Sequence, residues 1–288
     1  MYKQKSFTLI ELLVVIVIIG ILAGVIMIST SSSIDKASIA KSKVFADEIR
    51  NNLMIDIVSE WNFDNALNPY QDSVGINHGT CTNCPLYKTK DSKECIKSGC
   101  LNFKSENYVD LKNDSSLKIK DEITISLWLK GSGTALVKGG EPETYSVGIR
   151  NLKPFFYREC QDGENKYLNG NTIIDINKWN HFLFVDDGNL LKIYINTQLD
   201  PVTLSSIGWS AGLDNSSLYI GKGDVSGSES SLAGFLNGLI DEIQVYNSIL
   251  SSVLNKKNYI AGLNFLLLQG NISKEEYNER INALAYDN

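Results

Sequence analysis

The chain has 288 residues, of which 43% are hydrophobic, and a formal net charge of −6. This length allows an extended helix together with one sizeable domain that has its own hydrophobic core. The acidic balance excludes a chain-wide basic surface, so we expect no nucleic acid among the partners.

The N-terminal segment joins a short basic stub to a long apolar run. Residues 3–25 read KQKSFTLIELLVVIVIIGILAGV, and the apolar stretch 7–28 is about 33 Å long as a helix, enough to cross a bilayer core. Lys3 and Lys5 precede it, which favours a cytoplasmic start. Glu11 lies inside the run, where an ionised side chain costs about 2.5–3.5 kcal/mol even on lenient insertion scales. We therefore expect Glu11 to do more than anchor the chain.

The residues FTLIELLVVIVIIGILAGV, preceded by KQKS, resemble the N-terminus of type IV pilins and pseudopilins. The resemblance implies that a prepilin peptidase cleaves between Ser6 and Phe7, that Phe7 is then N-methylated, and that the apolar helix packs as a filament spine. Glu11 would neutralise the terminal amine of a neighbouring subunit, which supplies the partner that a buried charge requires. The sequence departs from the family at Ser6, where glycine is usual, and it lacks the proline that many pilins have in this helix.

Two other N-terminal segments share the basic start and apolar core, namely a secretory signal peptide and a simple signal-anchor. Neither explains the acidic residue at the head of the core, and no A-x-A-like site follows Ile28. We therefore favour residues 1–6 as a leader and 7–57 as a transmembrane and filament-spine helix. Residues 34–58 have apolar positions three to four apart, typical of an amphipathic helix. The serines at 29–33 mark either a weak point between its halves or the end of the membrane segment.

Five cysteines follow the N-terminal segment. In a chain that leaves the cytoplasm they favour disulfides over free thiols. The spacing of the first four, C-x2-C and C-x4-C, also fits a small zinc site, although no histidine lies among them. The connectivity stays open, and the five are Cys81, Cys84, Cys95, Cys100 and Cys160.

From Glu60 onward the pattern changes to short strands between turns. Residues 122–130 alternate apolar and polar positions. Residues 181–198 predict two strands around an Asp-Asp-Gly-Asn turn, and 218–223 and 239–247 predict two more. Because no helical pattern is interleaved, we expect an antiparallel sandwich. The side chains of 122–130 expected to face its core are Ile123, Ile125, Leu127 and Leu129.

These segments resemble laminin G-like, concanavalin A-type jelly-roll domains. The matching pieces, in the family's order, are EWNFDN, DSVGINHG, LNFKSENYVDL, ITISLWLK, WNHFLFVDDG and GLIDEIQVYNSIL. The resemblance covers residues 58–252 and implies a jelly-roll sandwich. Together with the long N-terminal helix and a short C-terminal helical hairpin, the expected fold class is α+β. Residues 103–108, FKSENY, lack two acidic positions of the family's motif, so we assign no ligand there.

Residues 253–288 predict a helical tail that packs on the domain or makes weak oligomer contacts. Gly270 and Asn271 break the helix, and Ser273 and Glu276 form a capping box that opens a last helix. The residues expected on one side of the first helix are Leu254, Ala261, Phe265 and Leu268.

The sequence predicts no catalytic residue and therefore no enzyme. Retaining glycoside hydrolysis requires two carboxyl groups about 5–5.5 Å apart. Asp241 and Glu242 are neighbours in a predicted strand and are expected on opposite faces. His181 begins an apolar strand and is expected to be structural, and His78 lies in a loop and is expected to be exposed.

Calcium is the only cofactor that we expect. In the laminin G-like superfamily a calcium ion often ties an early loop to the final strand, and calcium takes six to eight oxygen ligands. Asp72 and Asp241, with carbonyls near Asn77, are the candidate ligands of such a structural ion. The alternative is that Asp72 closes a turn by bonding its own backbone.

A glycan site requires exposed aromatic side chains that stack on sugar rings. Trp128 and Trp179 are expected in the core. The candidates for the glycan site are Tyr145, Phe155, Phe156, Tyr157 and Trp209.

Together these features predict a pilin-like subunit of a type IV filament that displays a laminin G-like adhesion or glycan-binding domain. The size of the chain favours a minor or tip subunit. The expected partners are other pilin subunits, prepilin peptidase, the cytoplasmic membrane before assembly, and an extracellular glycan or surface protein. Alternatives are a pseudopilin of a secretion or DNA-uptake apparatus, whose sandwich is structural, and less favoured, a surface glycosidase.

Overall fold

The computed structural model describes residues 57–139, 143–159, 165–207, 215–223 and 234–284. The chain divides into a unit of residues 1–45 and a unit of residues 46–288. The predictions for Ser6, Phe7, Glu11 and the spine helix lie outside the described residues, except that Ile57 belongs to a strand and not to the helix. Within the described ranges, no helix has the length and hydropathy needed to cross a membrane.

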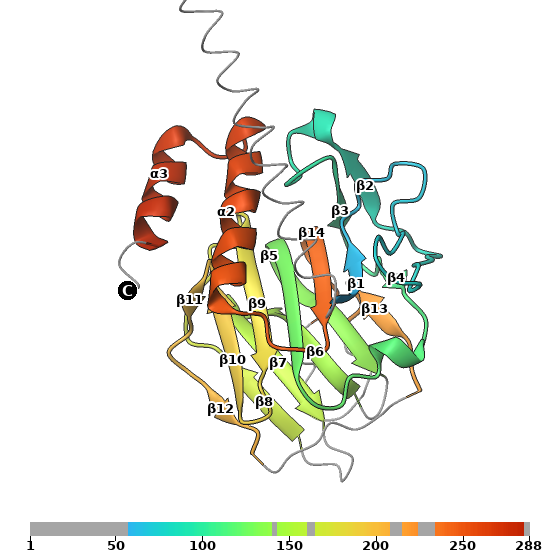
Figure 1. Cartoon of the computed structure of the whole chain (residues 1–288). Coiled ribbons are helices and arrows are strands. Elements are labelled where there is room, and N and C mark those ends of the chain that lie inside the picture. The colour runs from blue at the N-terminus through green and yellow to red at the C-terminus, as the bar shows by residue number, and fades with distance from the viewer. Residues whose placement is uncertain (1–56, 140–142, 160–164, 208–214, 224–233, 285–288) are drawn as a thin grey trace, which may run out of the picture. The chain divides into compact units, whose positions relative to one another are not determined.

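The described residues form two antiparallel sheets that face each other, which confirms the predicted sandwich (Figure 1). Sheet A has the order β11 (Gln198–Leu199), β10 (Leu190–Ile195), β9 (Asn180–Asp186), β5 (Ile123–Gly139), β14 (Asn237–Tyr246), β3 (Gly99–Phe103) and β2 (Leu86–Thr89). At its margins β1 (Ile57–Trp61) pairs with β14, and β12 (Leu204–Ser205) pairs with β10. Sheet B has the order β4 (Val109–Asp110), β13 (Leu218–Ile220), β5, β6 (Glu143–Arg150), β7 (Lys153–Glu159) and β8 (Asn165–Asn169).

Strand β5 belongs to both sheets and joins them. Its first part pairs with β14 as far as Ser132, and from Gly133 onward it pairs with β6. Gly131 lies at this crossing with φ +151°, and a Cβ there would come within 2.2 Å of the carbonyl oxygen of Asn237. Only glycine permits so close a contact between strands, so Gly131 allows β5 to continue from sheet A into sheet B.

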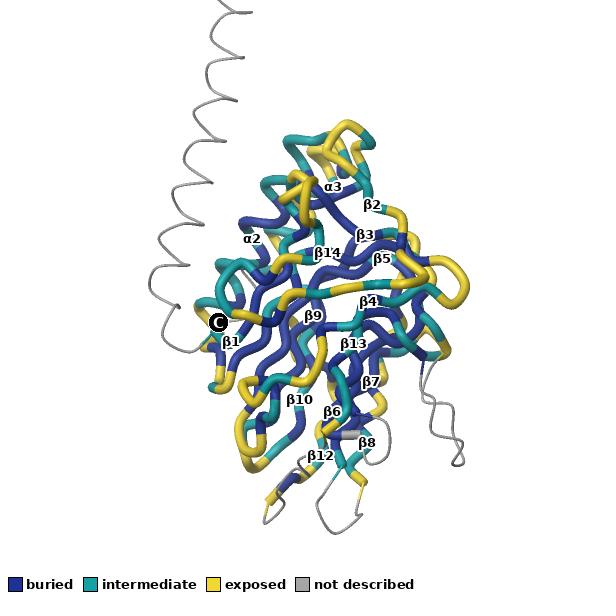
Figure 2. The backbone as a smooth tube through the Cα atoms, turned by 90° about the vertical axis from the view of Figure 1, so that its right-hand side faces the viewer, coloured by how far each residue is buried: buried dark blue, intermediate teal, exposed yellow. Residues whose placement is uncertain are grey.

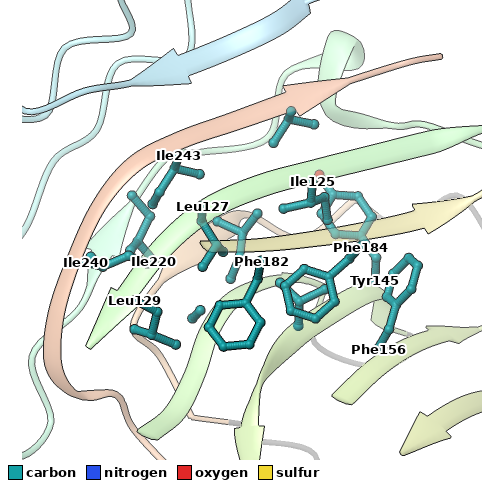
Figure 3. Packing of buried hydrophobic residues seen from close by; sticks show 14 of the residues in the cluster. Ile125, Leu127, Leu129, Tyr145, Phe156, Phe182, Phe184, Ile220, Ile240 and Ile243 are labelled. Carbon is teal, nitrogen blue, oxygen red and sulfur yellow. The ribbon is translucent and has the colours of Figure 1, made fainter. Parts of the chain in front are cut away.

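The main core lies between the sheets, and buried positions run along the strands of both (Figure 2). The four alternating residues predicted to face inward from β5 are at most 1% exposed. Phe182 and Phe184 of the predicted β9–β10 hairpin pack beside them, and Tyr145 and Phe156 face them from sheet B (Figure 3). The period-two pattern is thus confirmed for this part of the chain.

Helices α2 (Ser252–Leu268) and α3 (Lys274–Ala283) cover part of the outer face of sheet A (Figure 1). Trp128 of β5 and Tyr259 of α2 stack with ring centroids 5.6 Å apart. A Cβ on Gly262 would come within 2.3 Å of the Trp128 ring, so glycine allows the helix to lie directly on the indole. Trp128 and Trp179 are both buried, but in this second cluster and not between the sheets.

Of the four residues predicted to share one side of the first C-terminal helix, one is buried and three are partly buried; they are Ala261 and then Leu254, Phe265 and Leu268. Leu254 and Phe265 pack against buried clusters. The helix is turned so that Gly262 meets Trp128, because the flat indole admits no side chain at that position. The N-cap half of the predicted capping box is confirmed, since Ser273 Oγ accepts a hydrogen bond from the Glu276 N–H at 3.1 Å, whereas Glu276 Oε1 accepts from Arg280 Nη2 at 2.7 Å. The residues that α2 buries are Asn255, Tyr259, Ala261, Gly262, Leu263 and Leu266.

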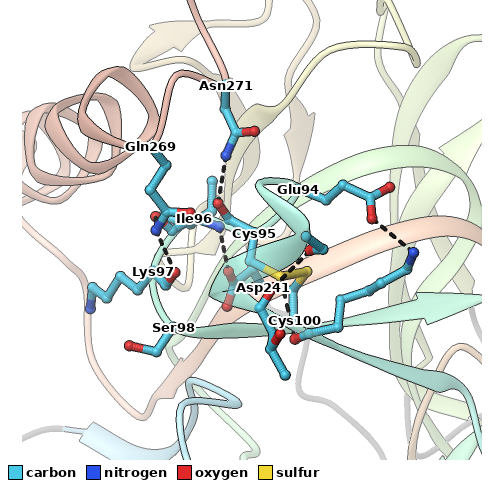
Figure 4. The surroundings of a disulfide bond; sticks show 12 residues. Glu94, Cys95, Ile96, Lys97, Ser98, Cys100, Asp241, Gln269 and Asn271 are labelled. Carbon is cyan, nitrogen blue, oxygen red and sulfur yellow. Dashed lines mark hydrogen bonds and ion pairs between the residues drawn. A yellow bond between two sulfur atoms is a disulfide. The ribbon is translucent and has the colours of Figure 1, made fainter.

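The first four cysteines form two disulfides, Cys81–Cys84 and Cys95–Cys100, whereas Cys160 lies outside the described residues. The Cys95–Cys100 loop ties the helical tail to the sandwich (Figure 4). Asn271 Nδ2 donates to the carbonyl oxygen of Cys95 at 2.8 Å, and Gln269 Nε2 donates to that of Ile96 at 3.1 Å. The helical tail therefore packs on sheet A as part of the same domain.

Candidate functional site

The aromatic candidates of β7 divide between two faces, because side chains alternate along a strand. Phe156 lies in the inter-sheet core with no exposed surface, and so does Tyr145 of β6. The prediction that either binds a glycan is therefore wrong. Phe155 and Tyr157 lie on the outer face of sheet B in a separate cluster, where Phe155 has no exposed surface and Tyr157 is 8% exposed. Trp209 lies outside the described residues.

A row of side chains crosses the outer face of sheet B. Tyr219 of β13 pairs with Val137 of β5, and Val137 pairs with Ser146 of β6. Ser146 pairs with Tyr157 of β7, which pairs with Tyr167 of β8. Residues directly opposite one another point to the same side of a sheet, so the row places tyrosines toward both margins of one face.

The two ends of this row are more accessible than its middle. Val137, Ser146 and Tyr157 are 2%, 0% and 8% exposed, whereas Tyr219 and Tyr167 are half-buried. At the β8 end the rings pack on one another, with Tyr157 and Tyr167 centroids 6.5 Å apart. We therefore expect the aromatic side chain that contacts a ligand to lie at the β13 end of the row and not at the β8 end.

We call the β13 end the tyrosine corner; it consists of Tyr108, Asp110, Tyr219 and Lys222. The Tyr108 and Tyr219 rings meet edge to face with centroids 5.8 Å apart. Lys222 Nζ lies 3.8 Å from the Tyr219 centroid and 5.4 Å from that of Tyr108. Asp110 pairs with Tyr219 across the strands. Half-buried rings beside an ammonium and a carboxylate can stack on a sugar ring and bind its hydroxyl groups.

Sequence reasoning missed the tyrosine corner, although two signals were present. Tyr108 ends the FKSENY segment, to which no ligand was assigned. Tyr219 stands between Leu218 and Ile220, which both face the core, so alternation alone places it outside. That the two tyrosines meet depends on the pairing of β4 with β13, about 110 residues apart in the chain.

Asp72 is buried and closes the turn of its own loop, as the alternative to a calcium ligand expected. Its Oδ2 accepts a hydrogen bond from the Asn77 N–H at 3.0 Å. The Asn77 carbonyl oxygen accepts one from Trp61 Nε1 at 2.9 Å. The N–H groups that donate to Asp72 Oδ1 are those of Glu60, Val74 and Gly75.

Asp241 belongs to a different network. Its carboxylate accepts hydrogen bonds from the N–H groups of Ile96 and Glu242, both at 2.8 Å. In the part of the chain that the structure describes, no group of three or more His, Cys, Asp or Glu side chains is arranged to hold a metal ion. Calcium at Asp72, Asn77 and Asp241 stays a prediction.

The expectation that Asp241 and Glu242 point to opposite faces is wrong. Strand β14 has a bulge here, and Glu242 has φ +51°. Ile240 and Ile243 both lie in the inter-sheet core, so the two acidic residues between them share the outer face. Burial, together with the neighbouring carboxylate of Glu242, raises the pKa of Asp241 well above its usual range. Burial also raises the pKa of Glu242 to about 7, although Lys97 Nζ lies 2.7 Å from its Oε2.

This bulge predicts a pH dependence of stability. Because the folded-state pKa of Glu242 is raised, its contribution is full below its usual pKa and is lost as the pH rises through about 7. We expect Glu242 to contribute about 1 kcal/mol more to the free energy of unfolding at about pH 6.5 than at about pH 8. His181, whose pKa burial lowers to about 3, acts in the opposite sense, because its imidazole protonates in the unfolded state near its usual pKa of about 6.5. The Glu242 contribution is therefore the difference between wild type and Glu242→Gln. Urea unfolding at a series of pH values measures the change.

Glu242→Gln should flatten this profile, because glutamine imitates the neutral form at every pH. Glu122→Gln is the matched control, since Glu122 is exposed, and it should leave the slope unchanged. Equal slopes for wild type and Glu242→Gln would contradict the assignment.

Both histidines lie in the environments that were predicted from the sequence. His181 is 1% exposed, and its Nε2 lies 2.9 Å from Ser126 Oγ, so it is a structural residue in the interior. His78 is exposed, and its Nδ1 accepts a hydrogen bond from the Asp72 N–H at 3.1 Å.

Two family models match the chain. That of the concanavalin A-like lectin/glucanases superfamily matches residues 103–253, just over half of the sequence. The chain belongs to this superfamily. The model of the prokaryotic N-terminal methylation motif matches residues 1–27, so this lectin-like chain also carries a pilin-type N-terminus. No curated protein matches it.

Solved structures agree with the concanavalin A-like fold of this lectin-like chain. The binding domain of paraclostridial mosquitocidal protein 1 matches with TM-score 0.56 and 14% identity, over 74% of this chain and 53% of that one. Botulinum neurotoxin serotype D ligand-binding domain, in complex with N-acetylneuraminic acid, matches with TM-score 0.57 and 14% identity, over 75% and 53%. Domain 4 of an extracellular arabinanase from Geobacillus stearothermophilus, in complex with arabinotriose, matches with TM-score 0.53 and 19% identity, over 70% and 97%. The lectin-like chain spans about half the length of the toxin domains, and identities this low show the fold alone.

Proposed function

We propose that this protein is a minor or tip subunit of a type IV filament that presents a non-enzymatic, glycan-binding sandwich outside the cell. The observation that carries the proposal is the combination in one chain of an N-terminal methylation motif and a lectin-like domain. Two structures of similar fold are complexes with a sugar, arabinotriose in one and N-acetylneuraminic acid in the other. Such a combination suits a filament that attaches to a carbohydrate surface.

The tyrosine corner supports glycan binding at the level of residues. Tyr108 and Tyr219 provide aromatic surface, and Lys222 and Asp110 provide a hydrogen-bond donor and acceptor beside it. Sugars require both, because one face of a pyranose is apolar and its rim carries hydroxyl groups. The helical tail packs on the outer face of the other sheet and so does not cover the tyrosine corner.

Processing follows from the N-terminal motif. Prepilin peptidase would cleave between Ser6 and Phe7, Phe7 would be N-methylated, and the helix would remain in the cytoplasmic membrane until assembly with other pilin subunits. The mass of the mature N-terminal peptide tests this step. A peptide that begins at methylated Phe7 is the expected result, whereas an intact Met1 or a cut after Ile28 would overturn the filament assignment.

Glycan binding is tested with the full chain, purified in a detergent without sugar groups and applied to an array of surface glycans. We expect binding to a subset of glycans and a loss of about tenfold or more for Tyr219→Ala, which removes a stacked ring. Tyr167→Ala, at the other end of the same row, is the matched control and should bind as wild type. Equal losses for both variants would exclude the tyrosine corner as the site.

The second candidate function is a pseudopilin whose sandwich is structural. Its basis is the same methylation motif, which filaments and secretion or DNA-uptake systems share by resemblance. Absence of binding to every glycan and surface protein tested would favour it, as would recovery of the chain with a secretion apparatus and not with surface filaments.

A further inference from the structure

A short turn closed by the Cys81–Cys84 disulfide lies beside the tyrosine corner. The turn precedes β2, and the disulfide joins its two ends with Cα atoms 5.2 Å apart. Backbone hydrogen bonds connect residues 80–84 to residues 106–110, the segment that ends in β4. Two of the four residues of the tyrosine corner belong to this segment, so the turn contacts the part of the chain that carries them.

Asn83, inside the closed turn, holds the backbone of Tyr108. The Tyr108 N–H donates to the carbonyl oxygen of Asn83 at 3.2 Å. The Asn83 side chain makes two more bonds to the same segment: Nδ2 donates to the carbonyl oxygen of Glu106 at 3.0 Å, and Oδ1 accepts from Asn107 Nδ2 at 2.9 Å. Three hydrogen bonds from one residue of the turn therefore fix the backbone from which the Tyr108 ring projects.

Thr80, next to the first cysteine, holds Asp110. The Thr80 N–H donates to the carbonyl oxygen of Asp110 at 2.8 Å, and the Asp110 N–H donates to that of Thr80 at 2.7 Å. This exchange of two bonds is the pattern of an antiparallel bridge. Because Asp110 also pairs with Tyr219 of β13, the turn supports the strand pair that brings the two tyrosines together.

The two disulfides differ in their accessibility. Cys84 is exposed and Cys81 is half-buried. In contrast, Cys95 and Cys100 have no exposed surface and lie in the cluster that α2 covers. Thiol–disulfide exchange requires a thiolate to reach one of the sulfur atoms, and exposed disulfides are the labile and regulatory ones. A mild reductant should therefore open the first disulfide and spare the second.

We propose that the Cys81–Cys84 disulfide is a redox switch of the tyrosine corner, whose reduction loosens the segment that carries Tyr108 and weakens glycan binding. The closed ring limits the conformations of the turn, and this limit keeps Asn83 and Thr80 opposite their partners. The effect on binding rests on the proposed glycan site, whereas the loosening of the segment does not.

The reductant in this reaction is a dithiol. One of its thiolates attacks Cys84 Sγ, and Cys81 leaves as a thiolate. The second thiol of the reductant then displaces Cys84 from the mixed disulfide. The protein disulfide thus takes up two electrons and two protons to give two thiols, and the dithiol is oxidised to a cyclic disulfide.

Hydrogen exchange tests the loosening without any ligand. The full chain in a sugar-free detergent is treated with dithiothreitol, and a sample is alkylated so that peptide masses identify the cysteines that have reacted. We expect alkylation of Cys81 and Cys84 and not of Cys95 and Cys100. We also expect amide exchange about tenfold or more faster in the peptide that contains residues 106–110. Reoxidation of a sample that was not alkylated should restore slow exchange.

The array of surface glycans measures the effect on binding. We expect reduction to weaken binding about fivefold or more, because the site loses its preorganisation. The double variant Cys81→Ser with Cys84→Ser should bind as weakly as reduced wild type and should not respond to dithiothreitol. A cooperative melting transition shows that this variant remains folded. Asn83→Ala keeps the disulfide and should weaken binding in both redox states. Thr82→Ala, at an exposed position of the same turn, is the matched control and should behave as wild type.

The outcomes separate the switch from the proposed function. Unchanged exchange and binding after reduction of Cys81–Cys84 would overturn the switch. A response of the double serine variant to dithiothreitol would also overturn it, because the effect would then arise at another cysteine. Faster exchange on reduction together with a blank glycan array would reject the proposed function and keep the loosening of the segment. Array binding that Tyr219→Ala removes and reduction leaves unchanged would do the reverse.

Discussion

Replacing Arg158 with methionine should lower the free energy of unfolding by about 3–5 kcal/mol, because it leaves a buried carboxylate without its partner. Arg158 of β7 has no exposed surface, and Asp186 at the end of β9 is 2% exposed. Arg158 Nη1 lies 2.6 Å from Asp186 Oδ2. One residue belongs to sheet B and the other to sheet A, so the ion pair joins the two layers of the sandwich.

The hydrogen bonds that surround this ion pair increase the expected loss in the free energy of unfolding. Arg158 Nη2 donates to the carbonyl oxygen of Ile119 at 3.0 Å, and Nη1 donates to that of Asp121 at 2.9 Å. Asp186 Oδ1 accepts from Ser206 Oγ at 2.9 Å. Removing the guanidinium therefore leaves these backbone carbonyls without that donor, and the carboxylate without its counter-charge, in a desolvated position.

Urea unfolding of the full chain measures this effect. Lys88→Met is the matched control, because Lys88 and Glu94 form an ion pair at 2.8 Å with both side chains partly exposed. Such pairs contribute about 0–1 kcal/mol. The double variant Arg158→Met with Asp186→Leu should recover part of the loss, since it removes both charges. A loss no larger for Arg158→Met than for Lys88→Met would contradict the structural role of the buried pair.

Replacing Glu11 with leucine should exclude the subunit from filaments while leaving it in the membrane. Leucine makes the apolar segment a better membrane span, since an ionised side chain there costs about 2.5–3.5 kcal/mol. It also removes the charge that we expect to pair with the methylated amine of Phe7 in a neighbouring subunit. The amount of the subunit in sheared filament and membrane fractions measures the effect, and near-complete absence from filaments is expected.

The control for this experiment is Ile10→Leu, which changes a neighbouring apolar residue without altering charge. It should enter filaments like wild type. The mass of the mature peptide from the membrane fraction separates failed processing from failed assembly. Normal incorporation of Glu11→Leu would mean that the carboxylate has no part in assembly, and the pilin-type interpretation of this residue would be lost.

Local patterns predicted the features whose causes are local. The alternation in β5, the β9–β10 hairpin and the N-cap at Ser273 each depend on residues a few positions apart, and each is confirmed. The preference for disulfides over free thiols also holds for the first four cysteines, although the sequence left their connectivity open. In contrast, the residues of α2 alone did not identify Gly262 as the position that meets Trp128, because that contact depends on how the helix docks on the sheet.

The sequence by itself determined the kind of molecule: a pilin-type N-terminus with a charged residue in an apolar helix, followed by strands that predict a lectin-like sandwich. Only the tertiary structure decided which side chains meet. Strand pairing brings Tyr108 to Tyr219, and the layering of the sheets brings Arg158 to Asp186. These contacts join residues 28 to 111 positions apart, and neither local period nor turn chemistry carries information over such distances. Glu11 could be recognised from a single segment because its function depends on the apolar residues around it.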